Sequence, residues 1–459
     1  YTGTPGDLMK KEVAIIICNF NKKEYVLQCI DSVFNLSFKD YDLYVVDNAS
    51  SDGSAEAIEA VYGNRVILIK NKENTGGSGG FNTGMKEALK KDYRYLYLLD
   101  NDIILHENAL TELYDYLESH QNVGIAGSLL YSMDNPTEIQ ELGAKIDWDN
   151  FIIKPNLKGS IDLGVPKELE CDYVPACSML VRTEAIKKVG LMEETNFIYW
   201  DDIEWGHRMK LHGYKVMACS GSKVWHKMGA ARKVNTFNTY YFWRNKIHFF
   251  VKYSDVNHIR QLADCIFYEA VLAVYSCNYT QKYNSARTII TAIEDALANI
   301  RGKAGEGRIF ELETVEDRFE NLMNNSPKVI LIDNENLKIV RDIATRIQMV
   351  NESTELIIAG KFHQVTYLRQ QFPGQKIIQY QAAFENKDGL ICQSCAHIFN
   401  LADELDGRVN AYIDGYFNII ASKEDREYAK NFQRTYKLFK NIYYPIFLEK
   451  VLRLREQMA

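Results

Sequence analysis

Two carboxylates flank an amide where an apolar segment ends, in the stretch "LYLLDNDIIL" at residues 96–105. Asp100 and Asp102, separated by Asn101, follow residues that are typical of a buried strand. Carboxylates at this spacing suit Mg²⁺ or Mn²⁺, ions that leave coordination positions open for the oxygens of a diphosphate. Because Asp and Asn also punctuate ordinary strand-to-loop turns, the spacing alone leaves both a metal site and a simple turn open.

A glycine-rich stretch, "NTGGSGGFNTGM" at residues 74–85, precedes this segment. Its glycines permit close backbone approach and positive φ, and the helix that it opens would favour anionic ligands at its start. The stretch lacks the Gly-Lys-Ser/Thr ending of a Walker A loop, and Asn82 stands where the last glycine of a GxGxxG motif would be. We expect either an anion-binding loop or a flexible surface loop.

Three acids lie together in "FIYWDDIEWGHRMKLHGY" at residues 197–214. Asp201 and Glu204 match a D-x-x-E helix start, a relative of the capping box. Asp202 is left over beside Trp200, and a carboxylate next to an aromatic side chain that can stack on a sugar suits a general base for a hydroxyl. From the spacing alone, base and cap are equal alternatives.

Two further features carry little signal by themselves. His226 follows the strand-like "SKVW", and a lone histidine there is more often structural unless a metal site lies nearby. Cys392 and Cys395 form a CxxC pair before His397, but a structural zinc would need further ligands and the sequence offers no second pair. We expect this pair to belong to an ordinary core.

The elements that must position these residues alternate between strand and helix from Glu12 to about Gly127. This order predicts a doubly wound, mostly parallel α/β sheet with helices on both faces. Ligands of such sheets bind beyond the carboxyl ends of the strands, so Asp47 and Asp100 share one edge. The expected strands and helices are 13–20, 24–36, 42–50, 54–63, 65–71, 84–91 and 93–100.

The rest of the chain is predicted to be mixed, then helical, then α/β again. We expect a disordered start or leftover of cloning at 1–10, a catalytic domain at 11–245, a helical segment and linker at 246–325, and a smaller α/β domain with terminal helices at 326–459. Pro445 should interrupt the last helical stretch. That stretch suits either a membrane surface or packing and dimerisation, and we favour the second.

Composition excludes several classes of protein. The 459 residues exceed one ordinary core, and 46% apolar with 25% charged residues is typical of a soluble globular protein. A net charge of -7 without a long basic tract argues against duplex nucleic acid as a partner. The sequence contains no run of 18 or more apolar residues, so we expect no membrane span. Nine cysteines in a long chain favour a reducing compartment, so we expect a cytoplasmic protein, at most bound to the inner face of the cell membrane.

Together these stretches resemble the inverting glycosyltransferases of family 2, which have the nucleotide-sugar-binding GT-A fold, across about residues 12–230. "VVDNASSDGS" is similar to their uridine-binding turn, and "LLDND" to their D-x-D metal motif. The glycine-rich stretch resembles the glycine-rich loop of the rhamnosyl- and galactofuranosyltransferase branch. "FIYWDDIEWGHR" resembles the W-D-D-x-E motif of the same branch, and "WH" resembles the motif that contains its metal-binding histidine. This sequence departs by carrying Asn48 after Asp47, where many relatives have a second Asp, and Asn101 inside D-x-D.

The resemblance implies roles for the matched residues. Asp202 would be the general base, and Asp102 and His226 would hold Mn²⁺ or Mg²⁺ with the diphosphate. Trp200 and Asp201 would shape the acceptor pocket. The remaining assignments are donor-nucleotide contacts by Asp47, Asn74, Gly79, Asn82 and Asp100, and a contact of Arg244 with diphosphate or acceptor.

The implied reaction moves a hexose from a UDP- or dTDP-linked sugar to a hydroxyl of a glycan, lipid-linked or glycoprotein acceptor, in bacterial cell-wall or polysaccharide synthesis. Two alternatives remain open. A sugar nucleotidyltransferase would need a basic glycine-rich loop early in the chain, where "VAIIICNFN" stands instead. A non-catalytic nucleotide-sugar-binding scaffold would have lost a metal or base residue, and none is lost. The sequence does not separate UDP-galactofuranose, UDP-galactose, UDP-glucose and dTDP-rhamnose.

Overall fold

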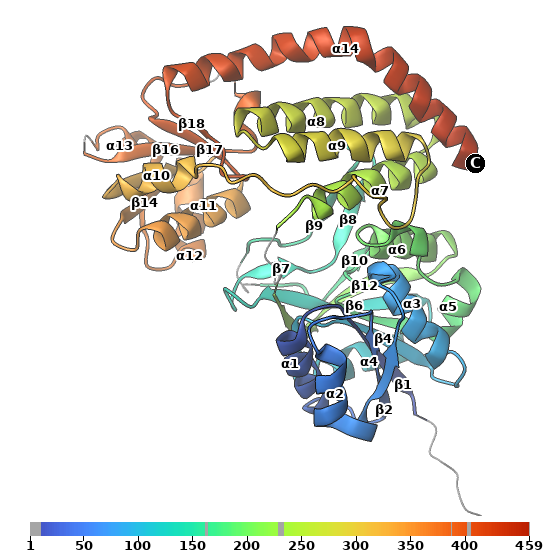
Figure 1. The fold of residues 1–459 in the computed structure, drawn as a ribbon. Helices are drawn as coiled ribbons and strands as arrows, with labels where there is room; N and C mark the ends of the chain where they lie inside the picture. Colours follow the sequence, from blue (N-terminus) through green and yellow to red (C-terminus); the bar gives the residue numbers. More distant parts are fainter. Residues whose placement is uncertain (1–10, 161–163, 228–233, 387, 402–404, 459) are drawn as a thin grey trace, which may run out of the picture.

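The computed structural model describes residues 11–160, 164–227, 234–386, 388–401 and 405–458, so the predicted disordered start at 1–10 lies outside the described residues. The described chain forms a ten-stranded sheet, a group of long helices and a second, six-stranded sheet (Figure 1). The predicted α/β class, with a smaller α/β unit after a helical segment, is confirmed.

The first half of the large sheet is parallel. Strands pair in the order β4-β1-β2-β3, and helices connect them along the chain. Ile15 and Ile17 of β1 pack into one core, whereas Ala14 and Ile16 pack into a second core on the opposite face. Burial on both faces explains the continuous apolar run of this strand. The bounds are β1 Val13–Asn19, α1 Lys23–Phe34, β2 Tyr41–Asp47, α2 Ser54–Tyr62, β3 Ile67–Lys70, α3 Gly76–Ala88 and β4 Tyr95–Asp100.

The second half of this sheet is mixed. β11 runs antiparallel to both β4 and β6, while β12 runs parallel to β6 and antiparallel to β5. A small hairpin, β8 with β9, stands beside the sheet. The bounds are β5 Ile103–Leu105, α4 Ala109–Ser119, β6 Val123–Ser132, β7 Ile139–Glu141, β8 Ala144–Asp147, β9 Ile152–Pro155, β10 Glu168–Cys171, β11 Ser178–Arg182, α5 Thr183–Val189, α6 Asp201–Leu211 and β12 Lys215–His226.

Three helices follow the large sheet, and an irregular segment then leads to the second sheet. That sheet has the order β15-β14-β13-β16-β17-β18 and is parallel except for β18. Cys392 and Cys395 are both buried in β16. The bounds are α7 Phe237–Tyr253, α8 Ile259–Tyr279, α9 Tyr283–Leu297, α10 Arg318–Asn324, β13 Lys328–Ile332, α11 Leu337–Val350, β14 Glu355–Gly360, α12 Val365–Gln371, β15 Lys376–Gln379, α13 Tyr380–Ala383, β16 Leu390–Cys395, β17 Ala411–Asp414, β18 Ile419–Ile420 and α14 Lys423–Met458. The domain boundaries stay a prediction, although α7 spans residue 245.

The expectation that Pro445 interrupts the last helix is wrong. α14 is 36 residues long, continues through Pro445 and curves over α8 (Figure 1). Pro445 is exposed, so water can bind the carbonyl that its missing N–H leaves free. Phe432, Phe447 and Val451 pack inward on α7 and α8, and this packing outweighs the lost hydrogen bond. Among the described residues, no helix is long and apolar enough to cross a membrane.

Candidate functional site

Strand pairing brings Asp100, Asp102 and His226 together. β4 ends at Asp100, β5 begins at Ile103, and His226 pairs with Ile103 as the last residue of β12. One ligand atom from each of the three lies within 4.8 Å of the others. His226 Nδ1 lies 3.1 Å from Gln140 Oε1, which orients the ring so that Nε2 faces Asp102 Oδ1 at 3.4 Å. Carboxylate and imidazole donors of this kind fit Mn²⁺ or Mg²⁺.

The two carboxylates of this cluster differ electrostatically. Burial and the neighbouring Asp102 charge raise the pKa of Asp100 above its usual range. Burial also opposes ionisation of Asp102, but the hydrogen bond and charge of His226, together with the Lys22 ammonium, outweigh it and lower the pKa of Asp102. Lys22 Nζ donates to Asp102 Oδ2 over 2.5 Å. Asp102 is therefore the carboxylate that stays ionised most readily.

The turn after β2 is joined to the glycine-rich stretch by amide side chains. Asp47 is 3% exposed and accepts hydrogen bonds from the Ser50 N–H and the Asn19 amide. Asn48 donates to Gly76 O over 2.8 Å and to Asn74 Oδ1 over 3.1 Å. A carboxylate could not donate either bond, which gives a physical reason for Asn48 where many relatives carry Asp.

The glycine-rich stretch is helical, whereas a loop was expected before residue 84. α3 begins at Gly76, whose φ of +78° suits glycine and whose added Cβ would lie 2.0 Å from Phe197 O. A Cβ on Gly80 would lie 2.3 Å from Cys18 Sγ, and one on Gly84 2.4 Å from Ile16 Cγ2. These glycines let α3 pack against β1 and the 197 loop at short range. Gly79 lies in the same helix, over the Thr75 side chain.

Asn82 does not face an open site. Its side chain is 1% exposed, donates to Met192 O over 2.9 Å and accepts from Met192 N over 3.1 Å. Both ends of the amide are thus used to hold the segment after α5 against α3. The predicted contact of Asn82 with the nucleotide gains no support from this geometry.

α6 begins differently from the predicted capping box. Its cap is Trp200, in the left-handed region at φ +68° with no side-chain cap, so Asp201 is the first helical residue. Glu204 instead pairs with Arg208 at 2.9 Å. Phe197, Tyr199 and Trp200 all have positive φ. Such backbone strain concentrates at functional sites.

A cavity of about 540 Å³ is lined by five of the eleven predicted site residues. Asp100 and His226 line it from the strand ends, and Trp200, Asp201 and Asp202 line it from the start of α6. Burial raises the pKa of Asp202 to about 7, and burial with the Asp202 charge raises that of Asp201 to about 8. Asp202 accepts hydrogen bonds from the N–H groups of Ile203 at 2.8 Å and Ala176 at 3.3 Å, which fix its orientation.

Residues 14–190 match the model of the glycosyl transferase family 2. They form a family 2 glycosyltransferase domain. The galactofuranosyltransferase GlfT2 of Mycolicibacterium smegmatis is 27% identical over 177 residues, 35% of this chain and 27% of that protein. The poly(ribitol-phosphate) beta-N-acetylglucosaminyltransferase TarP of Staphylococcus aureus is 34% identical over 122 residues, 26% of this chain and 36% of that protein. The chain thus matches about a quarter to a third of the length of these relatives.

Among solved structures, S. aureus TarS 1–349 in complex with UDP is similar to this chain with a TM-score of 0.42 and 15% sequence identity. The similarity covers 63% of this chain and 80% of that one.

Arg244 lies outside the residues that match the family 2 model, which end at residue 190, and is not placed for the predicted contact with diphosphate or acceptor. Its side chain is 0% exposed and donates to Gly302 O at 2.6 Å and Asn196 O at 3.2 Å. Neighbouring Asn245 donates to Asn196 O and Ile198 O, both at 2.8 Å. These two residues hold the loop that leads to Trp200. Arg244 therefore supports the cavity of about 540 Å³ indirectly.

Three polar residues near the metal-ligand cluster and the cavity of about 540 Å³ were not predicted from the sequence. Asn19 receives a 2.7 Å hydrogen bond from Asn101 and donates to Asp47, so it links two strand ends. Glu141 lines the cavity from β7, and its Oε1 is shielded from solvent with no hydrogen-bond partner among the described residues. Lys22 contacts Asp102. No local pattern marks Glu141 or Lys22, whereas Asn19 could have been noticed as a polar end to the first strand.

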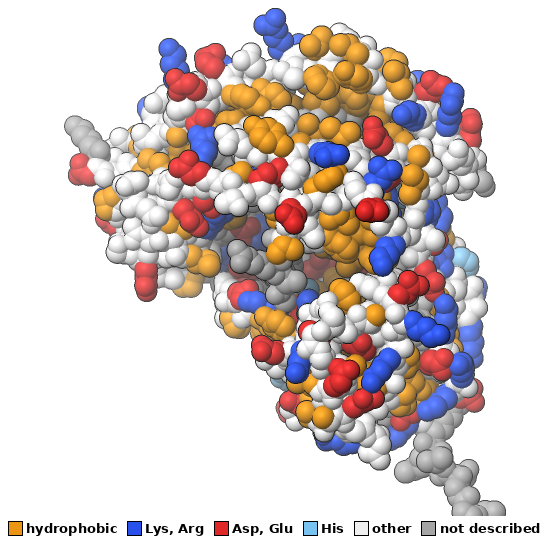
Figure 2. All heavy atoms as spheres, in the orientation of Figure 1, with side chains coloured by type: hydrophobic (Ala, Val, Ile, Leu, Met, Phe, Trp, Pro, Cys, Tyr) orange, Lys and Arg blue, Asp and Glu red, His pale blue; other side chains and the backbone are white. Residues whose placement is uncertain are grey.

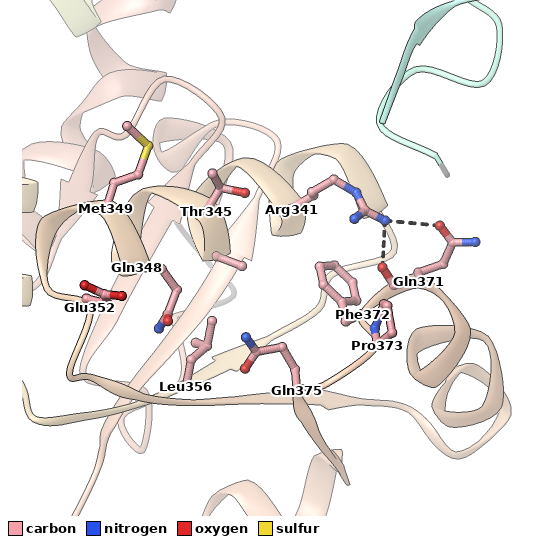
Figure 3. Close-up of a pocket in the computed structure, with 11 residues that line it drawn as sticks. Arg341, Thr345, Gln348, Met349, Glu352, Leu356, Gln371, Phe372, Pro373 and Gln375 are labelled. Carbon is pink, nitrogen blue, oxygen red and sulfur yellow. Dashed lines mark hydrogen bonds between the residues drawn. The ribbon is translucent and has the colours of Figure 1, made fainter. Parts of the chain in front are cut away.

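A second cavity, of about 630 Å³, lies outside the family 2 domain, between α11 and the segment after α12 (Figure 3). Among the described residues that line it, Arg341 is the one cation, and its guanidinium is already engaged. It donates to Gln371 O at 2.9 Å and Gln371 Oε1 at 3.1 Å, and also to Gly159 O at 2.6 Å. Arg341 therefore connects the C-terminal unit to the segment after β9.

Proposed function

We propose that this chain transfers a sugar from a nucleoside-diphosphate sugar to an acceptor hydroxyl, with inversion at the anomeric carbon. The observation that carries the proposal is that Asp100, His226 and Asp202 line one cavity. The first two belong to the cluster suited to a metal–diphosphate group, and the third is a carboxylate suited to proton abstraction. A single cavity can thus hold the leaving group, the sugar and the attacking hydroxyl in line.

The leaving-group end would be organised by Asp100, Asp102 and His226. Their oxygen and nitrogen donors would hold Mn²⁺ or Mg²⁺ together with the diphosphate. A divalent cation bound there would act as a Lewis acid for the departing diphosphate. Asp47 and the amide side chains around it would bind the nucleoside at the adjacent strand end.

At the other end, Asp202 would take the proton from the acceptor hydroxyl. Its two backbone hydrogen bonds keep the carboxylate in one orientation, and a pKa of about 7 matches a general base at neutral pH. One base and one displacement give inversion. A glycoside hydrolase would instead require a pair of carboxylates flanking the bond.

The acceptor end of the cavity is amphipathic. Trp200, Phe242 and Ile152 offer apolar surface to sugar rings, while Lys158 and Glu269 offer polar contacts. The relatives GlfT2 and TarP are named for different sugars, so we propose the donor class, UDP- or dTDP-linked, and not one sugar. The acceptor would be a glycan, lipid-linked or glycoprotein hydroxyl in cell-wall or polysaccharide synthesis.

The outer face of α14 would bring the enzyme to such acceptors. Five of its apolar side chains are 41–57% exposed: Leu438, Phe439, Ile442, Tyr443 and Ile446. Hydrophobic side chains gather along the top of the molecule, over this helix (Figure 2). Exposed Arg434, Lys437 and Lys450 accompany them. The sequence favoured packing or dimerisation for this segment. Because its inner face already packs on α7 and α8, we propose that the outer face binds an anionic membrane surface from the cytoplasmic side, with a homodimer as the alternative.

The test is a screen of the protein with Mn²⁺ against a panel of UDP- and dTDP-sugars, following release of the nucleoside diphosphate. Turnover of one donor, stimulated by an acceptor glycan, is expected. Release of pyrophosphate from a nucleoside triphosphate and a sugar phosphate would instead support a nucleotidyltransferase. Failure to bind any nucleotide in calorimetry would support a non-catalytic scaffold.

A further inference from the structure

Lys22 places an ammonium group directly on the proposed metal site. Its Nζ lies 2.5 Å from Asp102 Oδ2, and the two side chains are 24% and 5% exposed. Lys22 is the cap residue of α1, on the turn that follows β1, so it reaches the cluster from a different element than its three members. The cluster therefore has a fourth, cationic neighbour.

The charges of the cluster explain why a cation is needed there. Asp100 and Asp102 bring two carboxylates together at the ends of buried strands, and like charges in such surroundings repel strongly. His226 can offset one of them only when it is protonated. The Lys22 ammonium offsets the other through Asp102 Oδ2, so a metal ion that binds this carboxylate meets a positive charge already held there.

The main chain on both sides of Lys22 is anchored, so only its side chain is free to leave. Asn21 N donates to Ser50 Oγ over 3.0 Å, and Lys23 N donates to Asp52 Oδ2 over 2.9 Å. The flexible four-carbon stem of lysine can swing its charge away from Asp102 without moving the turn.

We propose that Lys22 is a built-in counterion that competes with the divalent cation for Asp102 and leaves the cluster when the cation binds. The inference rests on the metal site of the proposed function. Metal alone must displace the ammonium from its carboxylate. Metal arriving with a nucleoside diphosphate offers the displaced ammonium a new anionic partner. Nucleotide and metal should therefore bind with positive coupling, and Lys22 should supply part of that coupling.

The competition is tested by titrating the full chain with Mn²⁺, with and without UDP, and following free Mn²⁺ by electron paramagnetic resonance. Lys22→Gln should bind Mn²⁺ alone about tenfold more tightly than the wild type, because a charge-assisted hydrogen bond no longer has to be broken. UDP should then increase Mn²⁺ affinity by a smaller factor than in the wild type. Lys22→Arg should resemble the wild type.

Lys23→Gln is the matched control, because it removes the same charge from the exposed neighbouring residue and should leave Mn²⁺ affinity unchanged. Lys22→Met replaces Lys22→Gln if circular dichroism shows that the latter is not folded. Equal Mn²⁺ affinity in wild type and Lys22→Gln would overturn the inference while leaving the metal site intact. Absence of Mn²⁺ binding in every protein would overturn the metal site and the inference together.

Discussion

Glu141 and Asp202 line the same cavity, and burial raises the pKa of each carboxyl group to about 7. The charge of Glu141 also raises the pKa of Asp202. They differ in their partners, since Asp202 accepts two backbone N–H groups while Glu141 Oε1 has no hydrogen-bond partner among the described residues. This difference makes Glu141 a matched comparison for the base assignment.

Asp202→Asn should lose transfer by about 10²-fold or more while keeping donor binding, since a general base contributes about 10² to 10⁴. Glu141→Gln, an equally isosteric change in the same cavity, should keep most of the transfer rate. Initial rates of transfer and calorimetric affinity for the nucleotide sugar measure both effects. A greater loss of rate in Glu141→Gln than in Asp202→Asn would move the base to Glu141.

The pH dependence of transfer should follow the ionised fraction of Asp202. A base must be deprotonated to act, so kcat/KM should rise with pH and level off above about 7. The measurement is a profile of kcat/KM between pH 5 and 9. A rate that is already maximal at pH 5 would contradict a base with this pKa.

The contribution of Asp202 to the stability of the fold should fall as pH rises, whereas the rate of transfer should rise. The folded-state pKa of Asp202 is raised above the ordinary value of 3.8, so between about pH 4 and 7 the folded state binds more protons than the unfolded state. The contribution of this group to the free energy of unfolding therefore falls as pH rises through that window. Asp202→Asn should be more stable than the wild type at pH 8 and no more stable at pH 4, measured by urea unfolding. An Asp202→Asn variant that is less stable than the wild type at pH 8 would contradict this prediction.

Removal of divalent cations should abolish transfer. A Lewis acid is worth several kcal/mol at the transition state, so chelator should reduce the rate by roughly 10²-fold or more, and Mn²⁺ or Mg²⁺ should restore it. His226→Ala should raise the Mn²⁺ concentration needed for half-maximal activity. Full activity of the wild type in excess chelator would rule out the metal assignment.

Packing of α3 against β1 should make Gly84 intolerant of a side chain. Gly84→Ala places a Cβ 2.4 Å from Ile16 Cγ2, and such overpacking lowers the free energy of unfolding by about 1–3 kcal/mol. Gly77→Ala is the control, because its nearest neighbour is Asp201 Oδ2 at 3.7 Å. Urea unfolding measures both. Equal stability of the two variants would show that α3 can move away from β1.

The outer face of α14 should bind anionic vesicles. The wild type should float with phosphatidylglycerol vesicles at low salt, and Leu438→Asp combined with Ile442→Asp should remain unbound. Met349→Asp, an equally polar change at a residue that is 81% exposed on α11, serves as the control. A dimer that the double variant disrupts, with no flotation of the wild type, would assign this face to a second copy of the chain.

The parallel half of the large sheet could be predicted because its strands are buried on both faces. Continuous apolar runs such as that of β1 are diagnostic for this arrangement, and polar residues at their ends then share one edge. Asp47, Asp100 and Asp102 were placed in this way. His226 joined them only through the pairing of β12 with β5, a contact between distant segments that no local pattern encodes.

Other features depended on packing that the sequence does not reveal. The glycines of α3 suggested a loop, yet they serve close contact between a helix and a strand. Asn82 and Arg244 looked like ligand contacts, but backbone carbonyls use their hydrogen-bonding groups. No local sequence pattern marks Glu141, which belongs to the site because β7 lies beside the cavity.

The hydrogen bond from Arg341 to Gly159 O has a consequence for the architecture of the cavity. Gly159 N donates in turn to Ile139 O over 2.9 Å, and Ile139 begins the strand that carries Glu141. The C-terminal unit, which lies outside the family 2 segment, is thus two hydrogen bonds away from β7, the strand that lines the cavity through Glu141. Replacing the C-terminal unit with another one should therefore alter acceptor choice, unless the new unit also supplies an arginine that donates a hydrogen bond to Gly159 O.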